Sequence, residues 1–179
     1  MVAPLTIVGT REPDGRFDLA PKHLAMPLSW QDHYGFVCTP SHATYANARR
    51  EGCFTVSFPR PDQILITSLA AAPRREDDQK HALSAIPTIA ASEVDGVLVE
   101  DADLHLECEL DRIVDGFAEN SLIVGRIVAA AAASDTVRDA DVDAHEMIAH
   151  SPLLAYLHPG RFATITETRA FPYHVGFRR

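Results

Sequence analysis

FVCTPSHATYANARREGCFTVSF, residues 36–58, contains two strand signals on either side of a polar loop and a helix signal. Phe36–Cys38 is an apolar run of β type, and Pro40 ends it because proline has no backbone N–H to donate. Phe54–Phe58 alternates between apolar and polar residues, the period of a half-buried strand. This segment therefore predicts a strand, a loop, a short helix and a second strand.

The helix is predicted over Ala43–Glu51, which is rich in helix-forming residues. Ser41 is a suitable N-cap, and Gly52 is placed where glycine commonly ends a helix. The loop before the helix carries the hydroxyls of Thr39, Ser41 and Thr44 beside the free N–H groups of a helix start. A phosphate group prefers such donors at the positive end of a helix dipole. The alternative is that Ser41 only caps the helix and the threonines are solvated.

Length and charge limit the class of protein. The 179-residue chain is 46% hydrophobic and carries a formal net charge of -9, so a nucleic-acid partner is not expected. The N-terminus has no signal-peptide pattern, and no apolar run is long enough to span a membrane. Cys38, Cys53 and Cys108 are widely spaced and are predicted to be buried, reduced thiols. We expect one cytoplasmic domain over residues 1–179.

The rest of the chain is mainly β in pattern. Further strands are predicted over Leu5–Thr10, Arg16–Leu19, Gly96–Val99, Leu104–Val114, Ser121–Ala131, Leu153–Leu157 and Arg161–Thr166, with turns at Glu12–Gly15 and Asp115–Gly116. A helix is predicted over Gln63–Ala72, a short helix or turn over Lys80–Ala85, and a short helix or acidic loop over Ala140–His150. Ala20–Trp30 contains two prolines and is predicted to be an ordered loop. The pattern favours an antiparallel barrel with helical insertions, which would bind a large ligand at its rim or between subunits.

Several possible catalytic and metal motifs fail on spacing. The histidines of His145–His150 lie five residues apart rather than the four of a zinc-protease helix. His105, Glu107 and Glu109 share one face of the predicted strand Leu104–Leu110, where a solvated acidic surface is favoured over a metal site. The sequence contains no dinucleotide-binding glycine motif, P-loop or nucleophile elbow. No side chain is therefore predicted to act as a catalytic acid, base or nucleophile.

Five blocks, in order along the chain, resemble the flavin reductase-like, FMN-binding split-barrel family. They are TREPDGRFDLAP (10–21), residues 36–58, LHLECEL (104–110), SLIVGRIVAA (121–130) and SPLLAYLHPGRF (151–162). The resemblance implies a six-stranded antiparallel split β-barrel with Greek-key connections and short helical insertions. It also implies a homodimer that holds FMN at the subunit interface.

The resemblance also implies site residues. Those expected to approach the isoalloxazine ring are Ala20, Pro21, Lys22, His23 and Leu24, with Lys22 and His23 near the ring. Those expected at the FMN phosphate are Thr39, Pro40, Ser41, His42 and Thr44, with Asn47 on the helix behind them. The chain departs from the family pattern twice: Asp18 stands where asparagine is common, and His42 where a lysine or arginine is common. A histidine is a weaker and pH-sensitive partner for a phosphate.

The activity that this resemblance implies is an NAD(P)H-dependent flavin reductase or a related oxidoreductase that uses FMN, or FAD, and that works with a partner monooxygenase. The alternatives are a flavin carrier without turnover, and a barrel that holds haem, a deazaflavin or pyridoxal phosphate. Five aromatic residues are expected either at a dimer interface or as plugs of the barrel ends. They are Trp30, Phe36, Phe171, Tyr173 and Phe177.

Overall fold

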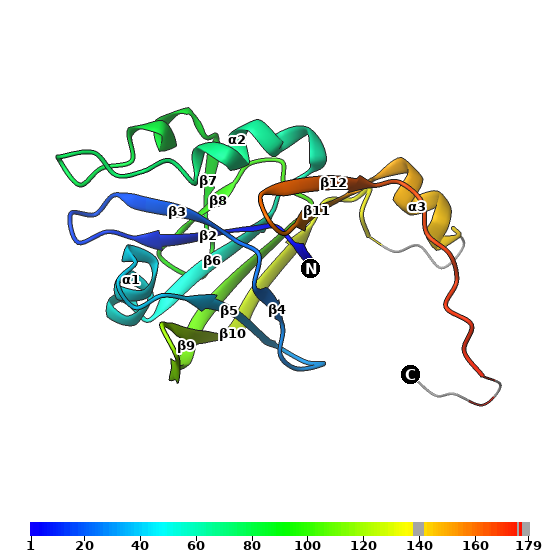
Figure 1. The fold of residues 1–179 in the computed structure, drawn as a ribbon, viewed down its shortest axis with the longest axis horizontal. Coiled ribbons are helices and arrows are strands. Elements are labelled where there is room, and N and C mark those ends of the chain that lie inside the picture. Colours follow the sequence, from blue (N-terminus) through cyan, green and yellow to red (C-terminus); the bar gives the residue numbers. More distant parts are fainter. Residues whose placement is uncertain (138–141, 175, 177–179) are drawn as a thin grey trace.

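The computed structural model describes residues 1–137, 142–174 and 176. Its main element is a sheet with the strand order β3-β2-β6-β9-β10-β5-β4, in which every neighbouring pair is antiparallel (Figure 1). The strands are β2 (Thr6–Arg11), β3 (Phe17–Lys22), β4 (Ala25–Pro27), β5 (His33–Cys38), β6 (Cys53–Phe58), β9 (Leu104–Phe117) and β10 (Asn120–Ala132). The predicted antiparallel β architecture is confirmed, with seven strands in this sheet rather than six.

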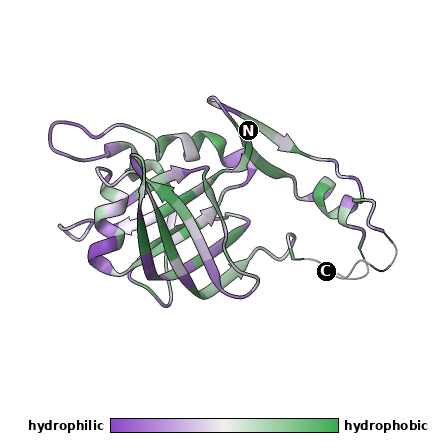
Figure 2. Ribbon diagram, turned by 60° about the horizontal axis from the view of Figure 1, so that its bottom comes forward, coloured by the Kyte–Doolittle hydropathy of each residue, from purple (hydrophilic) through white to green (hydrophobic). Residues whose placement is uncertain are grey.

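The sheet curls because its two edge strands are neighbours in the chain. Only His23 and Leu24 separate the end of β3 from the start of β4. Six interstrand spacings would place the edges of a flat sheet about 29 Å apart, whereas three Cα–Cα steps reach about 11 Å. The strands therefore bend around a common interior, as Figure 2 shows. The result is a barrel that remains open between β3 and β4.

The barrel interior is filled by large side chains that alternate along the strands. Val8, Phe36, Phe54, Val56 and Ile123 are each at most 1% exposed, and the rings of Phe36 and Phe54 pack edge to face at 5.1 Å. Phe36 was expected at a dimer interface or as a plug of a barrel end, but it is part of the core. A solid interior of this kind leaves no room for a large ligand inside the barrel.

The helix α1 (Ala43–Glu51) has the predicted bounds and lies across one end of the barrel (Figure 1). It ends at Gly52, whose φ of 69° is in the left-handed region and whose N–H donates to the Ala48 carbonyl. The residue in the N-cap position is His42, and it makes no side-chain cap hydrogen bond. The prediction that Ser41 caps this helix was wrong.

Residues 59–103 cover the outer face of β2 and β3. They form η1 (Pro61–Gln63), α2 (Ile64–Leu69), η2 (His81–Ala85), β7 (Thr88–Ala90) and β8 (Val97–Val99). Ile7 and Leu19 point outward from the barrel and pack with Ala70, Ile86 and Val99 in a second apolar cluster. The helix predicted over Gln63–Ala72 is thus shorter, and a two-stranded β7–β8 sheet follows it.

A third sheet, β1-β11-β12, lies beyond the barrel with α3 (Figure 1). Its strands are β1 (Val2–Pro4), β11 (Leu153–Leu157) and β12 (Arg161–Ile165), and α3 spans Ala144–His150. The β1 strand was not predicted, whereas β11 has the predicted bounds. Phe171 and Tyr173 lie beyond β12 and are 70% and 45% exposed. Phe177, and residues 140 and 141 of the predicted helix, lie outside the described residues.

Three further predictions need correction. Ala20–Trp30 is not simply a loop, because it contains the end of β3 and all of β4. The β9 strand continues through Asp115 and Gly116 to Phe117, so the hairpin turns at residues 118–119 instead. Glu107 is 6% exposed rather than solvated, and its carboxylate accepts hydrogen bonds from the backbone N–H groups of residues 92–94.

The described part of the chain contains no group of three or more residues that could hold a metal ion, and none of its helices is long and apolar enough to cross a membrane. Cys38 and Cys108 are buried free thiols, as predicted, but Cys53 is only partly buried. Burial raises the pKa of the Cys108 thiol to about 12, so this thiol is protonated near neutral pH.

Candidate functional site

The start of α1 is open to a cavity of about 650 Å³, which we call the cationic cavity. Its lining includes six of the predicted site residues: Ala20, Pro21, Lys22, Ser41, His42 and Thr44. Since no side chain caps the helix, the first N–H groups of α1 retain their donor capacity beside the Ser41 and Thr44 hydroxyls. The structure thus brings the end of β3 and the hydroxyl loop together at one cavity.

Lys22 supplies positive charge to this cavity. Its Nζ donates a hydrogen bond to Cys38 Sγ at 3.4 Å and lies 5.9 Å from the centre of the Phe36 ring. Among the described residues, no carboxylate forms an ion pair with it. A partly buried lysine without a carboxylate partner can bind an anionic ligand at little cost in lost internal contacts.

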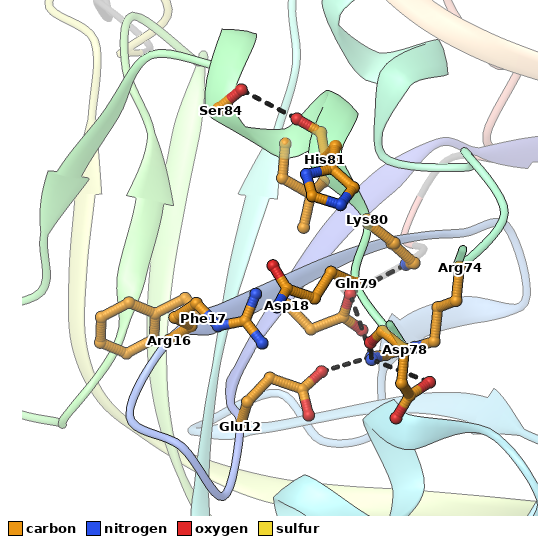
Figure 3. A pocket seen from close by; sticks show the side chains of 11 residues that line it. Glu12, Arg16, Phe17, Asp18, Arg74, Asp78, Gln79, Lys80, His81 and Ser84 are labelled. Carbon is orange, nitrogen blue, oxygen red and sulfur yellow. Dashed lines mark hydrogen bonds and ion pairs between the residues drawn. The ribbon is translucent and has the colours of Figure 1, made fainter. Parts of the chain in front are cut away.

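Two other cations, Arg74 and Lys80, line the same cavity but are paired. Lys80 Nζ lies 2.9 Å from the Asp18 carboxylate, and the Arg74 guanidinium contacts both Glu12 and Asp18 (Figure 3). Asp18 itself is 3% exposed. These residues come from the β2–β3 hairpin and from the segment after α2, and their charges largely cancel.

His42 lies between these groups and the helix start. Desolvation, followed by the positive charges of Lys22 and Lys80, holds the pKa of His42 below its usual value. The imidazole is therefore mainly neutral near pH 7, when it can donate one hydrogen bond but adds no charge. This leaves the charge of the lysine at position 22 as the main attraction for an anion.

A second cavity, also of about 650 Å³, lies on the other side of Pro21 and Ala71, which line both cavities. We call it the apolar cavity, because its lining includes Leu5, Ile64, Leu65, Tyr156 and Phe162. It connects the open side of the barrel with α2 and the third sheet.

Two aromatic rings are stacked at the apolar cavity. The ring centres of His23 and Tyr156 are 4.5 Å apart, and the Tyr156 hydroxyl accepts a hydrogen bond from the Gly160 N–H at 2.9 Å. Desolvation is the main cause of a lowered pKa at His23, and the charges of His158 and Lys22 act in the same direction. A neutral imidazole beside a phenol ring is a surface on which a flat aromatic ligand can stack.

Four predicted site residues line neither cavity. The Thr39 hydroxyl donates to the Asn120 side chain at 3.2 Å, and Pro40 lies beside it in the loop. Asn47 is buried, donates to Thr10 Oγ1 at 3.3 Å and accepts from Arg50 at 3.0 Å. The Leu24 carbonyl accepts a hydrogen bond from the Val37 N–H at 2.8 Å, which holds the link between β3 and β4. Thr39, Asn47 and Leu24 thus connect parts of the fold to one another.

Arg74, Lys80 and Tyr156 line the two cavities but were not among the predicted site residues. Arg74 lies in the charged run of residues 74–78 and Lys80 begins the segment predicted as a short helix or turn, and nothing local in either segment indicates that its cation reaches Asp18. Tyr156 belongs to the strand Leu153–Leu157 that was predicted, yet alternation along that strand gives no sign of the histidine it contacts.

The two cavities together suit one kind of ligand. An uncapped helix start, two hydroxyls and a lysine match an anionic group such as a phosphate. The neighbouring apolar cavity matches a planar, largely apolar ring. A flavin mononucleotide has both parts, so the residues present fit this cofactor.

Comparison with known proteins supports this interpretation. A sequence model described as "Flavin reductase like domain" matches residues 1–165. Among solved structures, flavoredoxin from Methanosarcina acetivorans has 19% identity and a TM-score of 0.78, with 98% of this chain and 91% of that one covered. Nitrilotriacetate monooxygenase component B from Bacillus cereus has 17% identity, a TM-score of 0.81 and coverages of 96% and 88%.

A third similar structure is BorF, the flavin reductase component of a bacterial two-component tryptophan halogenase. It has 19% identity and a TM-score of 0.71, with 94% of this chain and 93% of that one covered. A search of curated proteins gives no match. At these identities the structures show a common fold, and the sequence model shows the family.

Proposed function

This chain belongs to the flavin reductase-like domain family, and we propose that it is an FMN-binding oxidoreductase that uses NAD(P)H. The observation that carries the proposal is the pairing of the cationic and apolar cavities across Pro21 and Ala71. Their chemistry differs in the same way as the two ends of FMN, a phosphate and a tricyclic ring. FMN, rather than a flavin without phosphate, is supported by the unpaired Lys22 beside an open helix start.

Each group of residues has a role in this proposal. Lys22, Ser41, Thr44 and the first N–H groups of α1 hold the phosphate, with His42 as a further donor. His23 and Tyr156 hold the ring and exclude water from one of its faces. When bound, the flavin supplies hydride-transfer chemistry. The protein then has only to position the flavin and to shield it from water. This role agrees with the lack of any acid–base pair among the predicted site residues.

We also propose that the protein is a homodimer. Trp30 is fully exposed and Met26 is 56% exposed, and both lie in β4 or the turn that follows it, beside the open side of the barrel. Large exposed apolar and aromatic side chains are enriched at protein interfaces. A partner subunit at this face would cover the side chains and restrict solvent at the split between β3 and β4.

A partner oxygenase is the proposed consumer of the reduced flavin. The similar structures include a monooxygenase component and the reductase component of a halogenase, which supports a two-component system here as well. A flavin carrier without its own turnover uses the same fold and is the second candidate.

The test combines binding with reduction. FMN is titrated at pH 7 while flavin fluorescence is followed, with riboflavin as the ligand that lacks phosphate. The holoprotein is then mixed anaerobically with NADH or NADPH, and the absorbance near 450 nm, about the flavin band, is followed in a stopped-flow instrument. Bleaching supports the reductase, and binding without bleaching supports the carrier. A protein that binds neither flavin contradicts the proposal.

A further inference from the structure

Asp18 is the most deeply buried carboxylate at the cationic cavity, with 3% of its surface exposed. A buried carboxylate is costly unless cations or donors compensate it. Here Lys80 Nζ lies 2.9 Å from its Oδ1 and Arg74 Nη2 lies 3.6 Å from the same oxygen. Figure 3 shows both cations reaching from the segment after α2 toward the β2–β3 hairpin.

Both cations also make hydrogen bonds within the protein. Lys80 Nζ donates to the Leu19 carbonyl at 3.0 Å and to the Ala70 carbonyl at 3.2 Å, and its contact with Asp18 is an ion pair. Arg74 donates to Glu12 and to the Asp78 carbonyl at 2.7 Å. The positive charge of each cation is therefore already compensated by groups of the protein.

The charges therefore divide the cavity into two parts. Glu12, Asp18 and Asp78 face Arg74 and Lys80, so the part formed by these residues carries no net positive charge. The part that contains Lys22, the hydroxyl loop and the start of α1 keeps its positive charge. A ligand with one phosphate can be held in the second part, whereas a further phosphate would face carboxylates in the first.

We propose that Asp18 is a specificity-determining residue, which neutralises Lys80 and Arg74 so that the cavity favours a flavin mononucleotide over a flavin that carries a diphosphate. The inference rests on the proposed function. Asp18 acts on the ligand through the two cations, as a positioning residue, and does not itself contact the phosphate.

The test is Asp18→Asn, which keeps the shape of the side chain and removes one negative charge. Lys80 and Arg74 are then balanced by Glu12 and Asp78, and the negative charge in excess at this part of the cavity is lost. We expect the affinity for FAD to rise about tenfold at about 0.01 M ionic strength, the affinity for FMN by no more than about threefold, and that for riboflavin not at all. At about 1 M ionic strength the gain for FAD should disappear.

Asp14→Asn is the matched control, because Asp14 lies in the same hairpin and pairs with Arg16 at the surface, away from both cavities. It should leave all three affinities unchanged. Lys80→Met tests the opposite direction: it leaves the Asp18 charge in excess and should lower the FAD affinity more than the FMN affinity. This second variant also keeps the test decisive if Asp18→Asn does not fold.

Inorganic pyrophosphate and inorganic phosphate provide probes that do not depend on flavin binding. By calorimetry, Asp18→Asn should bind pyrophosphate about tenfold more tightly than the original protein does, with a smaller change for phosphate. A folded Asp18→Asn protein with unchanged FAD-to-FMN and pyrophosphate-to-phosphate ratios would overturn the inference. If the original protein binds no flavin but the pyrophosphate ratio shifts, the proposed function fails while the electrostatic role of Asp18 stands.

Discussion

The cationic and apolar cavities have the same volume, about 650 Å³, and share Pro21 and Ala71, yet their chemistry is opposite. In the cationic cavity, the recognition groups are a lysine, two hydroxyls and the N–H groups of a helix start. In the apolar cavity they are the stacked His23 and Tyr156 rings and aliphatic side chains from α2. The difference indicates that charge selects one end of the ligand and shape selects the other.

The largest effect is expected from Lys22→Met, which removes the unpaired charge and keeps most of the aliphatic chain. A charge-assisted hydrogen bond contributes about 2 kcal/mol, or about 30-fold in affinity. FMN binding should weaken by that factor, while riboflavin binding changes less than about twofold. Fluorescence titration with both ligands measures the difference. Equal losses for both ligands would mean that Lys22 shapes the ring site and would remove the distinction between the cavities.

Tyr156→Leu should act on both ligands alike. Loss of an aromatic contact costs about 1 kcal/mol, so FMN and riboflavin should each bind about fivefold more weakly. Tyr156→Phe is the control: it keeps the ring beside His23 and loses only the hydroxyl that accepts from Gly160. A loss confined to FMN would show that this side chain belongs functionally with the phosphate residues.

One serine in each cavity allows a matched pair of substitutions, whose expected effects on ligand binding are smaller. Ser41 lines the cationic cavity, and Ser68 lines the apolar cavity and donates to the Leu65 carbonyl at 2.6 Å. Ser41→Ala should weaken FMN binding about threefold, the effect of about 0.7 kcal/mol for a neutral hydrogen bond. Ser68→Ala should leave the binding of FMN and riboflavin unchanged in the same titration. A larger loss of FMN affinity for Ser68→Ala than for Ser41→Ala would contradict the placement of the phosphate in the cationic cavity.

The smallest effects concern His42 and His23, one in each cavity. Both pKa values lie below the usual 6.5, with desolvation as the largest cause. By NMR titration, FMN should raise the pKa of His42, because the phosphate stabilises the imidazolium, and should change that of His23 less. An upward shift confined to His23 would contradict the proposed orientation of FMN.

The same lowered pKa values affect folding. Between pH 6.5 and the lower folded-state values, the unfolded chain binds more protons than the folded protein, so stability falls as the pH falls. Denaturant unfolding at pH 7 and at about pH 5.5 should show a smaller difference for the His23→Gln/His42→Gln double variant than for the original protein. An equal difference would mean that other groups account for the acid sensitivity.

Local signals were sufficient for some elements. The bounds of α1 and β11 were predicted correctly, since a glycine stop and a short apolar run mark them in sequence. The end of β3 and all of β4 were missed because Pro21 and Pro27 argue against a strand. Both prolines are tolerated in β3 and β4 because these strands form the edges of the sheet, where a missing N–H costs little.

The candidate site was less accessible to sequence reasoning. Alternation correctly placed Glu107 on the outer face of its strand, but it could not indicate that residues 92–94 cover that face. The neutralisation of Asp18 depends on cations more than fifty residues away in the chain. The hydroxyl loop was found from sequence because its donors are contiguous, whereas the charge balance around it depends on the tertiary fold.

The link between β3 and β4 has a consequence for how such proteins can change during evolution. With only His23 and Leu24 between the strands, the chain cannot gain residues there without loosening the curvature that brings the hairpin next to α1. New ligand preferences are therefore more easily acquired by substitution along β3 or by remodelling residues 70–80. The two-residue link thus fixes the distance between the elements that line the cavities, whereas the side chains on those elements can still change.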